Sequence, residues 1–121
     1  MLDDQRMALL ARLMDVSVLR AQVHAGNIAN QNTPGYRAKA VAFDEAFQAA
    51  LAEGDGAAAT TLEPEVVEPH TTAVQADGND VALSAEIMAS AKNQTLYNSY
   101  LAMMRGKMRL LNIAAGQAPG G

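Results

Sequence analysis

Residues 27–37 have the sequence Asn-Ile-Ala-Asn-Gln-Asn-Thr-Pro-Gly-Tyr-Arg, and they mark the point at which a long helical pattern stops. Pro34 disfavours helix at Thr33, and Gly35 permits the positive φ of a type II turn. Asn tolerates the left-handed conformation at a helix end. An ordinary helix-to-loop turn explains Pro34 and Gly35, but it does not explain the whole string. The stretch predicts that a helix ends near residue 30 and that a defined turn follows.

Upstream of this turn, apolar residues repeat with helical spacing from about residue 4 to residue 30. The gaps alternate between four and three residues, as in a coiled-coil seam, through Met7, Ala11, Met14, Val18, Ala21, Ala25 and Ile28. A second row contains Leu9, Leu13, Val16, Arg20 and Val23. Because this row widens the apolar face, it predicts burial against more than one neighbour. A helix of this length spans roughly 40 Å, which is too long for a compact core of this size.

The other end of the chain repeats the design over residues 83–115. Its seam contains Leu83, Ile87, Ser90, Gln94, Tyr97, Leu101, Met104, Met108, Leu111 and Ala115. Ser84 is the expected N-cap, and Glu86 falls in the first turn. Ser90 and Gln94 either align the seam through hydrogen bonds or mark a seam edge that drifts into solvent. Residues 116–121 are rich in Gly and are expected to form a flexible tail.

Between the helices, residues 31–82 contain all but one of the prolines and show no sustained period. They predict an irregular, partly extended insert that is mobile in the isolated chain. One short helix is expected over residues 44–52, with Asp44 as its cap and Phe47 and Leu51 on one side. Residues 60–76 are expected to be extended or to form a poor hairpin.

These patterns predict a mainly α fold, with long N- and C-terminal helices packed as a coiled-coil-like hairpin around an irregular, partly extended insert. The expected segments are an N-terminal helix at 1–30, the insert at 31–82, a C-terminal helix at 83–115 and a tail at 116–121.

Composition excludes several classes of partner. The net charge is −4, so nucleic acid is not expected. Aromatic residues make up only 4% of the chain, which disfavours a small-molecule substrate site, and no cofactor is expected. No stretch approaches a membrane span, and the first residues do not resemble a cleavable signal. The absence of cysteine excludes disulfides and thiolate metal sites but does not choose a compartment.

No catalytic or metal-binding constellation is recognisable. His24 and His70 lack the spacing of metal ligands. Asp77-Gly78-Asn79-Asp80 resembles the start of a calcium loop, but the twelfth position is Met88 instead of Glu. A tight turn that leads into the second helix is the better interpretation. The sequence therefore predicts that this protein is not an enzyme.

The string at 27–37 resembles the bacterial flagellar axial proteins of rod and hook, whose N-terminal helix ends in Asn-Ile-Ala-Asn, two residues and Thr-Pro-Gly-Tyr. Every fixed position matches. Further stretches resemble the proximal rod members in particular: 43–47 (Phe-Asp-Glu-Ala-Phe), 77–83 (Asp-Gly-Asn-Asp-Val-Ala-Leu), and Asn93-Gln94 with Tyr97. Ala82 and Ser84 depart from that pattern, because the family tends to carry acidic residues there.

The resemblance implies a structural subunit of the proximal rod, polymerised through its terminal helices into the torque-transmitting drive shaft and the wall of the export channel. It implies contacts with copies of itself, other flagellar rod proteins, the adaptor FliE, the membrane ring and the export gate of the basal body. It also implies export by the flagellar type III apparatus without a cleaved signal peptide, and a final location in the periplasm.

The expected assembly interface consists of the two seams and the turn between them: Met7, Met14, Val18, Asn27, Ile28, Asn30, Thr33, Pro34, Gly35, Tyr36, Ile87, Gln94, Tyr97, Leu101, Met104, Met108 and Leu111. An alternative is a helical adaptor or secretion chaperone that binds one amphipathic partner helix. A rod subunit is expected to be poorly ordered as a monomer and to gain helix on polymerising, whereas an adaptor forms a defined soluble complex.

Overall fold

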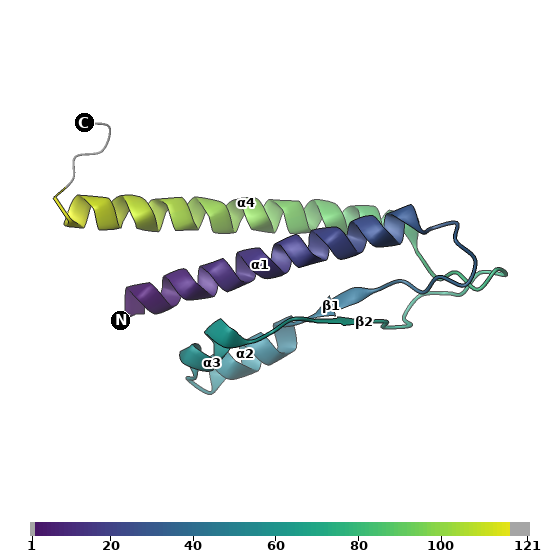
Figure 1. Ribbon diagram of the computed structural model, residues 1–121, viewed down its shortest axis with the longest axis horizontal. Helices are drawn as coiled ribbons and strands as arrows, with labels where there is room; N and C mark the ends of the chain where they lie inside the picture. The colour runs from purple at the N-terminus through teal and green to yellow at the C-terminus, as the bar shows by residue number, and fades with distance from the viewer. Residues whose placement is uncertain (1, 117–121) are drawn as a thin grey trace.

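The computed structural model describes residues 2–116 as two long antiparallel helices with an insert between them (Figure 1). The elements in chain order are α1 (Leu2–Ala29), β1 (Ala40–Ala42), α2 (Asp44–Ala52), α3 (Gly56–Thr61), β2 (Glu65–Val67) and α4 (Leu83–Ala114). The predicted fold class is confirmed. The tail expected at residues 116–121 lies outside the described residues, apart from Gly116. The division of the chain into two rod helices, an insert and a tail stays a prediction.

Two polar contacts tie α1 to α4. The Asn93 side-chain Nδ2 donates to the Ser17 carbonyl oxygen at 2.8 Å, and His24 Nδ1 lies 2.7 Å from Glu86 Oε2. Both contacts fit one antiparallel register. In that register, residues 108–114 of α4 extend about two turns past the start of α1, as Figure 1 also shows.

The insert packs on α1 and leaves α4 on the other side of that helix (Figure 1). Its buried core contains Val16 of α1 together with Phe43, Phe47 and Ala59. The two phenylalanine rings stack with their centroids 5.0 Å apart. Leu9 and Leu13, which belong to the second apolar row of the sequence, pack against this core. α1 is therefore covered by two different neighbours, and its wide apolar face serves both.

A two-stranded antiparallel sheet closes the insert. β1 and β2 pair with Ala40 opposite Val67 and Ala42 opposite Glu65, and α2 and α3 form the connection between the strands. The chain then runs back along the insert to the start of α4 (Figure 1).

Two predicted helix caps were wrong. Asp44 is the first residue of α2 and follows Phe43, the N-cap, which makes no side-chain capping bond; the Asp44 carboxylate pairs with Arg20 at 3.0 Å instead. Ser84 lies inside α4, whose N-cap is Ala82. α4 begins earlier because the chain just before it is held by buried side chains, as shown below. In α2, Phe47 is buried, but Leu51 is 41% exposed.

The sequence did not predict α3. Residues 60 and 61 belong to this helix, so the expectation of extended chain from residue 60 was wrong at its start. The Asp55 carboxylate accepts a hydrogen bond from Ala58 N at 3.0 Å and caps the helix. Asp55 followed by three alanines at 57–59 was a usable local signal, because alanine is the best helix former.

Candidate assembly interface

The apolar seam residues lie along the two helices without reaching full burial. Met7, Met14, Ile28, Tyr97, Leu101 and Met104 are half-buried, and Val18, Ile87, Met108 and Leu111 are exposed. Val18 is 47% exposed and Ile87 is 53% exposed. An isolated chain thus leaves much of the predicted seam in contact with solvent.

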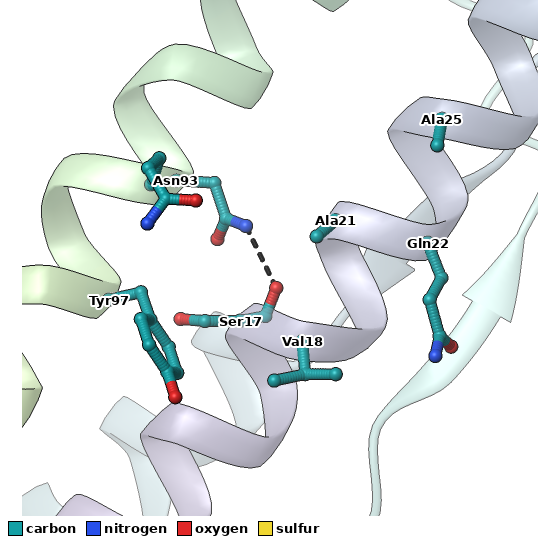
Figure 2. Close-up of a pocket in the computed structure, with 8 residues that line it drawn as sticks. Ser17, Val18, Ala21, Gln22, Ala25, Asn93 and Tyr97 are labelled. Atoms are coloured by element: carbon teal, nitrogen blue, oxygen red, sulfur yellow. Dashed lines mark hydrogen bonds between the residues drawn. The ribbon is translucent and has the colours of Figure 1, made fainter.

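One groove runs beside the contact between α1 and α4 and contains part of this seam (Figure 2). This seam groove has a volume of about 350 Å³ and is lined by Ser17, Val18, Ala21, Gln22, Ala25, Asn93, Gln94 and Tyr97. Figure 2 shows Val18, Ala21 and Ala25 along α1, with Asn93 and Tyr97 on the neighbouring α4. Because the alanine side chains are small, a further helix can approach the α1 backbone closely at this point.

Asn93 makes the polar contact between the helices that was expected of Ser90 or Gln94. It is 7% exposed and makes a hydrogen bond across the helix pair to Ser17 (Figure 2). Gln94 instead donates to the Asn98 Oδ1 atom, one turn along the same helix, at 3.1 Å. A buried polar side chain that is satisfied in only one register fixes how two helices slide against each other.

A second groove, the open-end groove, lies between α1 and α4 near their free ends. It has a volume of about 490 Å³ and is lined by Arg6, Leu9, Leu10, Leu13, Met103, Gly106, Lys107 and Leu110. Beyond it, the overhang of α4 at residues 108–114 carries Met108, Leu110, Leu111 and Ile113, which are 53%, 63%, 44% and 50% exposed. Although Arg109 and Asn112 also lie on this overhang, four large exposed apolar side chains are typical of a segment that becomes buried among neighbours.

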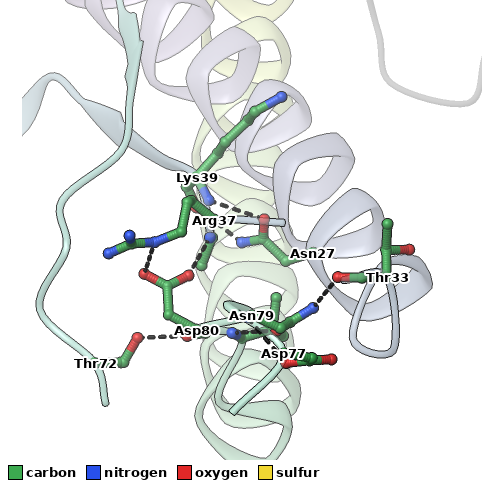
Figure 3. A network of polar contacts seen from close by, with 10 residues as sticks. Asn27, Thr33, Arg37, Lys39, Thr72, Asp77, Asn79 and Asp80 are labelled. Carbon is green, nitrogen blue, oxygen red and sulfur yellow. Dashed lines mark hydrogen bonds and ion pairs between the residues drawn. The ribbon is translucent and has the colours of Figure 1, made fainter. Parts of the chain in front are cut away.

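The closed end of the hairpin is held by a buried polar network (Figure 3). Asn27 at the end of α1 has no exposed surface. Its Nδ2 donates to the Lys39 carbonyl at 2.8 Å, and its Oδ1 accepts from Lys39 N at 2.9 Å and from the Tyr36 hydroxyl at 3.2 Å. The side chain thus pairs with the Lys39 backbone much as a strand would, and it fixes the direction in which the chain leaves α1.

Asn79 repeats this arrangement on the other side of the turn. It also has no exposed surface, and its Nδ2 donates to the carbonyls of Asn30 and Thr33, both at 2.8 Å. Its Oδ1 accepts from Val81 N at 2.8 Å. One side chain therefore binds the end of α1, the turn that follows it and the segment that leads into α4.

Asp80 completes the network from the neighbouring position. Its carboxylate accepts hydrogen bonds from Ala38 N and from Arg37 Nε, the latter at 2.9 Å (Figure 3). The Ala38 backbone hydrogen bond, followed by the Arg37 side chain and a smaller electrostatic effect of His70, lowers the pKa of Asp80 below its ordinary value, against the opposing effect of burial.

We expect acid to weaken the fold through Asp80. Because its pKa is lower in the folded state, its contribution is fully present above the ordinary carboxyl pKa of about 3.9 and is lost as pH falls through the folded-state value. Urea denaturation from pH 7 to pH 2.5 measures this loss. Asp80→Asn should lower stability at pH 7 and flatten the fall below pH 4. The exposed Asp15→Asn variant is the control, and an unchanged acid slope in Asp80→Asn would contradict the assignment.

The two sequence motifs meet at this network. Gly35 N donates to the Asp77 carbonyl at 2.9 Å, and Gly35 and Gly78 both have positive φ values, of 76° and 87°. A Cβ atom at Gly78 would lie 3.3 Å from the Gly35 Cα atom, so the two backbones touch where neither residue has a side chain. The turn after α1 and the turn before α4 therefore form one unit.

This arrangement divides the predicted turn residues into two groups. Asn27 is buried inside the chain, while Asn30 and Tyr36 are half-buried and make hydrogen bonds within it. Thr33, Pro34 and Gly35 are exposed. A contact of this turn with an adjoining subunit stays a prediction. Asn79 and Asp80, which the sequence predicted only as part of a turn, connect the two turns.

These two turns contain the residues that resemble the flagellar axial proteins. The chain is similar to FlgB. This relative is the flagellar basal body rod protein FlgB of Borreliella burgdorferi, which is 23% identical over 120 residues, covering 84% of this chain and 89% of the relative. No protein-family model matches the chain. Similarity to FlgB at this level suggests the flagellar rod protein family at most, and with it a structural role in the basal body.

Two features of the described residues concern other classes of site. Residues 2–116 contain no helix that is both long and apolar enough to cross a membrane. The part of the chain that the structure describes also contains no cluster of three or more His, Cys, Asp or Glu residues arranged to hold a metal ion. The similarity to FlgB, whose name describes a structural protein, suggests a function without catalysis.

Proposed function

We propose that this protein is a structural subunit of the proximal rod of a bacterial flagellar basal body. It polymerises through its terminal helices into the drive shaft that transmits torque and into the wall of the export channel. The similarity to FlgB supports this proposal, and so does the match to the turn motif of the axial proteins. The observation that carries it is the exposed apolar seam, because Val18, Ile87, Met108 and Leu111 need neighbours that a single chain does not supply.

The proposal includes partners and a route to the site of assembly. The neighbours are copies of this chain, other rod proteins, the adaptor FliE, the membrane ring and the export gate. The flagellar type III apparatus exports the chain, without a cleaved signal peptide, to the part of the basal body that crosses the periplasm. A monomer of low stability suits such export, because the chain unfolds to pass a narrow channel and then gains further helical contacts on the growing rod.

A double substitution on the seam tests this function. We expect Val18→Asp with Ile87→Asp to abolish swimming and rod incorporation in a strain of the source bacterium that lacks its own copy. Both side chains are about half exposed in the single chain, so the charges remain hydrated there and become costly only when a neighbour covers them. Swimming halos and the protein content of purified basal bodies are the measurements.

The matched control is Ala8→Asp, an exposed position of α1 that lines neither groove. This variant should swim normally. A seam variant that also swims normally and enters the basal body would exclude the seam as the polymerising surface.

The open-end groove favours one alternative, a helical adaptor or secretion chaperone. Its lining is almost entirely apolar and has the character of a groove that receives one amphipathic helix. Circular dichroism separates the two functions. A rod subunit gains helix when mixed with other rod components and forms polymers, whereas an adaptor is already helical and gives a complex of fixed stoichiometry.

A further inference from the structure

Charge is strongly segregated along this chain. Residues 40–86 contain ten Asp and Glu residues and no Lys or Arg, whereas residues 87–116 contain four Lys and Arg residues and no acid. The first range includes the whole folded part of the insert, and the second includes nearly all of α4. Most of the acidic charge thus lies in the insert, and α4 beyond its first turn is basic.

The basic part coincides with the exposed apolar end of α4. Arg105 and Arg109 are exposed and lie one turn apart on the same face of the helix. The exposed Met108 and Ile113 lie next to them along α4. We call this surface, formed by Arg105, Met108, Arg109 and Ile113, the basic end.

The acidic part has matching exposed chemistry. Glu45 and Glu53 lie at the two ends of α2 and are exposed, and the exposed Ala49 lies midway between them, one turn from each. None of these three side chains contributes to the buried core of the insert, which uses Phe47 of the same helix. We call this surface, formed by Glu45, Ala49 and Glu53, the acidic face.

A single chain cannot bring these two surfaces together. α1 lies between α4 and the insert, so the basic end and α2 lie on opposite sides of that helix (Figure 1). α1 and α4 are also locked in one register by the Asn93 and Glu86 contacts. A contact between the two surfaces therefore requires a second molecule.

We propose that the basic end of one copy docks on the acidic face of a second copy. The opposite charges select this pairing over contacts between like surfaces, and Met108 and Ile113 of the basic end pack over the small Ala49 side chain. The inference rests on the proposed polymerisation and specifies which surfaces meet.

The contact between the basic end and the acidic face is heterologous. Because the two surfaces are different and lie on opposite sides of the chain, a pair of bound copies still presents one free basic end and one free acidic face. Such a heterologous contact adds copies in one direction and forms rings or open helical assemblies instead of a closed dimer. A tube wall needs a contact of this type.

A charge exchange tests the contact on the full chain. One variant carries Arg105→Glu and Arg109→Glu, and the other carries Glu45→Lys and Glu53→Lys. We expect each variant alone to associate at least about tenfold more weakly than the wild type, since like charges then face each other. An equimolar mixture should regain association, because both contacts between unlike variants are complementary. Sedimentation velocity over a concentration series measures this, and circular dichroism checks that each variant folds.

Cross-linking reports the geometry of the same contact. The chain contains no cysteine, so Ile113→Cys in one preparation and Ala49→Cys in another provide the only thiols. Oxidation of the mixture should give disulfide-linked dimers. The matched control pairs Ile113→Cys with Ala8→Cys, which lies on α1 outside the acidic face and should not cross-link.

The outcomes separate this inference from the proposed function. Wild-type chains that stay monomeric at all concentrations, alone and with rod components, contradict the polymerisation itself. Wild-type chains that polymerise while both charge variants associate equally well, without the expected cross-link, overturn only the pairing of these two surfaces. Recovery in the mixture together with the cross-link supports both.

Discussion

Replacing Asn79 by Asp should lower the free energy of unfolding by roughly 3 to 5 kcal/mol, since the change places an unpaired charge in a buried site. The Asn79 Nδ2 donates to the carbonyls of Asn30 and Thr33. An Asp side chain has no hydrogen to donate when ionised, so two carbonyl oxygens would face a carboxylate oxygen. Urea denaturation monitored by circular dichroism at 222 nm measures the loss.

The control for this substitution is Asn32→Asp. Asn32 lies in the turn after α1 and is exposed, so the same chemical change there should alter stability by no more than about 0.5 kcal/mol. A loss below about 1 kcal/mol in Asn79→Asp would show that the turn before α4 separates from the turn after α1 without much cost. The two motifs would then not act as one unit.

Replacing Phe47 by Ala should release the insert from α1. Phe47 is 8% exposed and stacks on Phe43 against Val16, and large-to-small changes at such positions cost about 3 to 5 kcal/mol. The core of the insert contains few other large side chains. We therefore expect local unfolding of residues 40–67, while the helices of the hairpin remain formed.

Hydrogen exchange measured by mass spectrometry tests this expectation segment by segment. Peptides from the insert should exchange much faster in Phe47→Ala, and peptides from the middle of α1 and α4 should change little. Leu51→Ala is the matched control, because Leu51 belongs to the same helix but is 41% exposed and lies outside the core. Uniformly faster exchange along the whole chain would mean that the insert and the hairpin fold as one cooperative unit.

The two terminal helices could be predicted because their signals are local. An uninterrupted run of apolar residues at helical spacing, ended by Pro34 and Gly35, needs no information from elsewhere in the chain. The second apolar row on α1 also indicated that this helix has more than one neighbour, and Leu9, Leu13 and Val16 do pack against the insert. α3 was missed although Asp55 provides a cap, because a helix of six residues has too few apolar positions to show a period.

The details of the caps and the polar contacts were not predictable in the same way. Ser84 has the right chemistry for an N-cap, but the start of α4 is determined by Asn79 and Asp80, which are anchored to residues about 40 to 50 positions away. Asn93 and Gln94 are neighbours with similar hydrogen-bonding groups. Only the packing of α1 on α4 decides that Asn93 crosses between the helices and Gln94 does not.

The sequence by itself determined the helices, the turn that ends the first of them and the mainly α fold class, because each depends on backbone preferences and on spacing within about 30 residues. The tertiary structure alone decided that the turn after α1 and the turn before α4 close on each other through Asn27, Asn79 and Asp80. It also decided that the basic end and the acidic face lie on opposite sides of α1. Both outcomes depend on contacts between distant parts of the chain, and such contacts leave no periodic signal in the sequence.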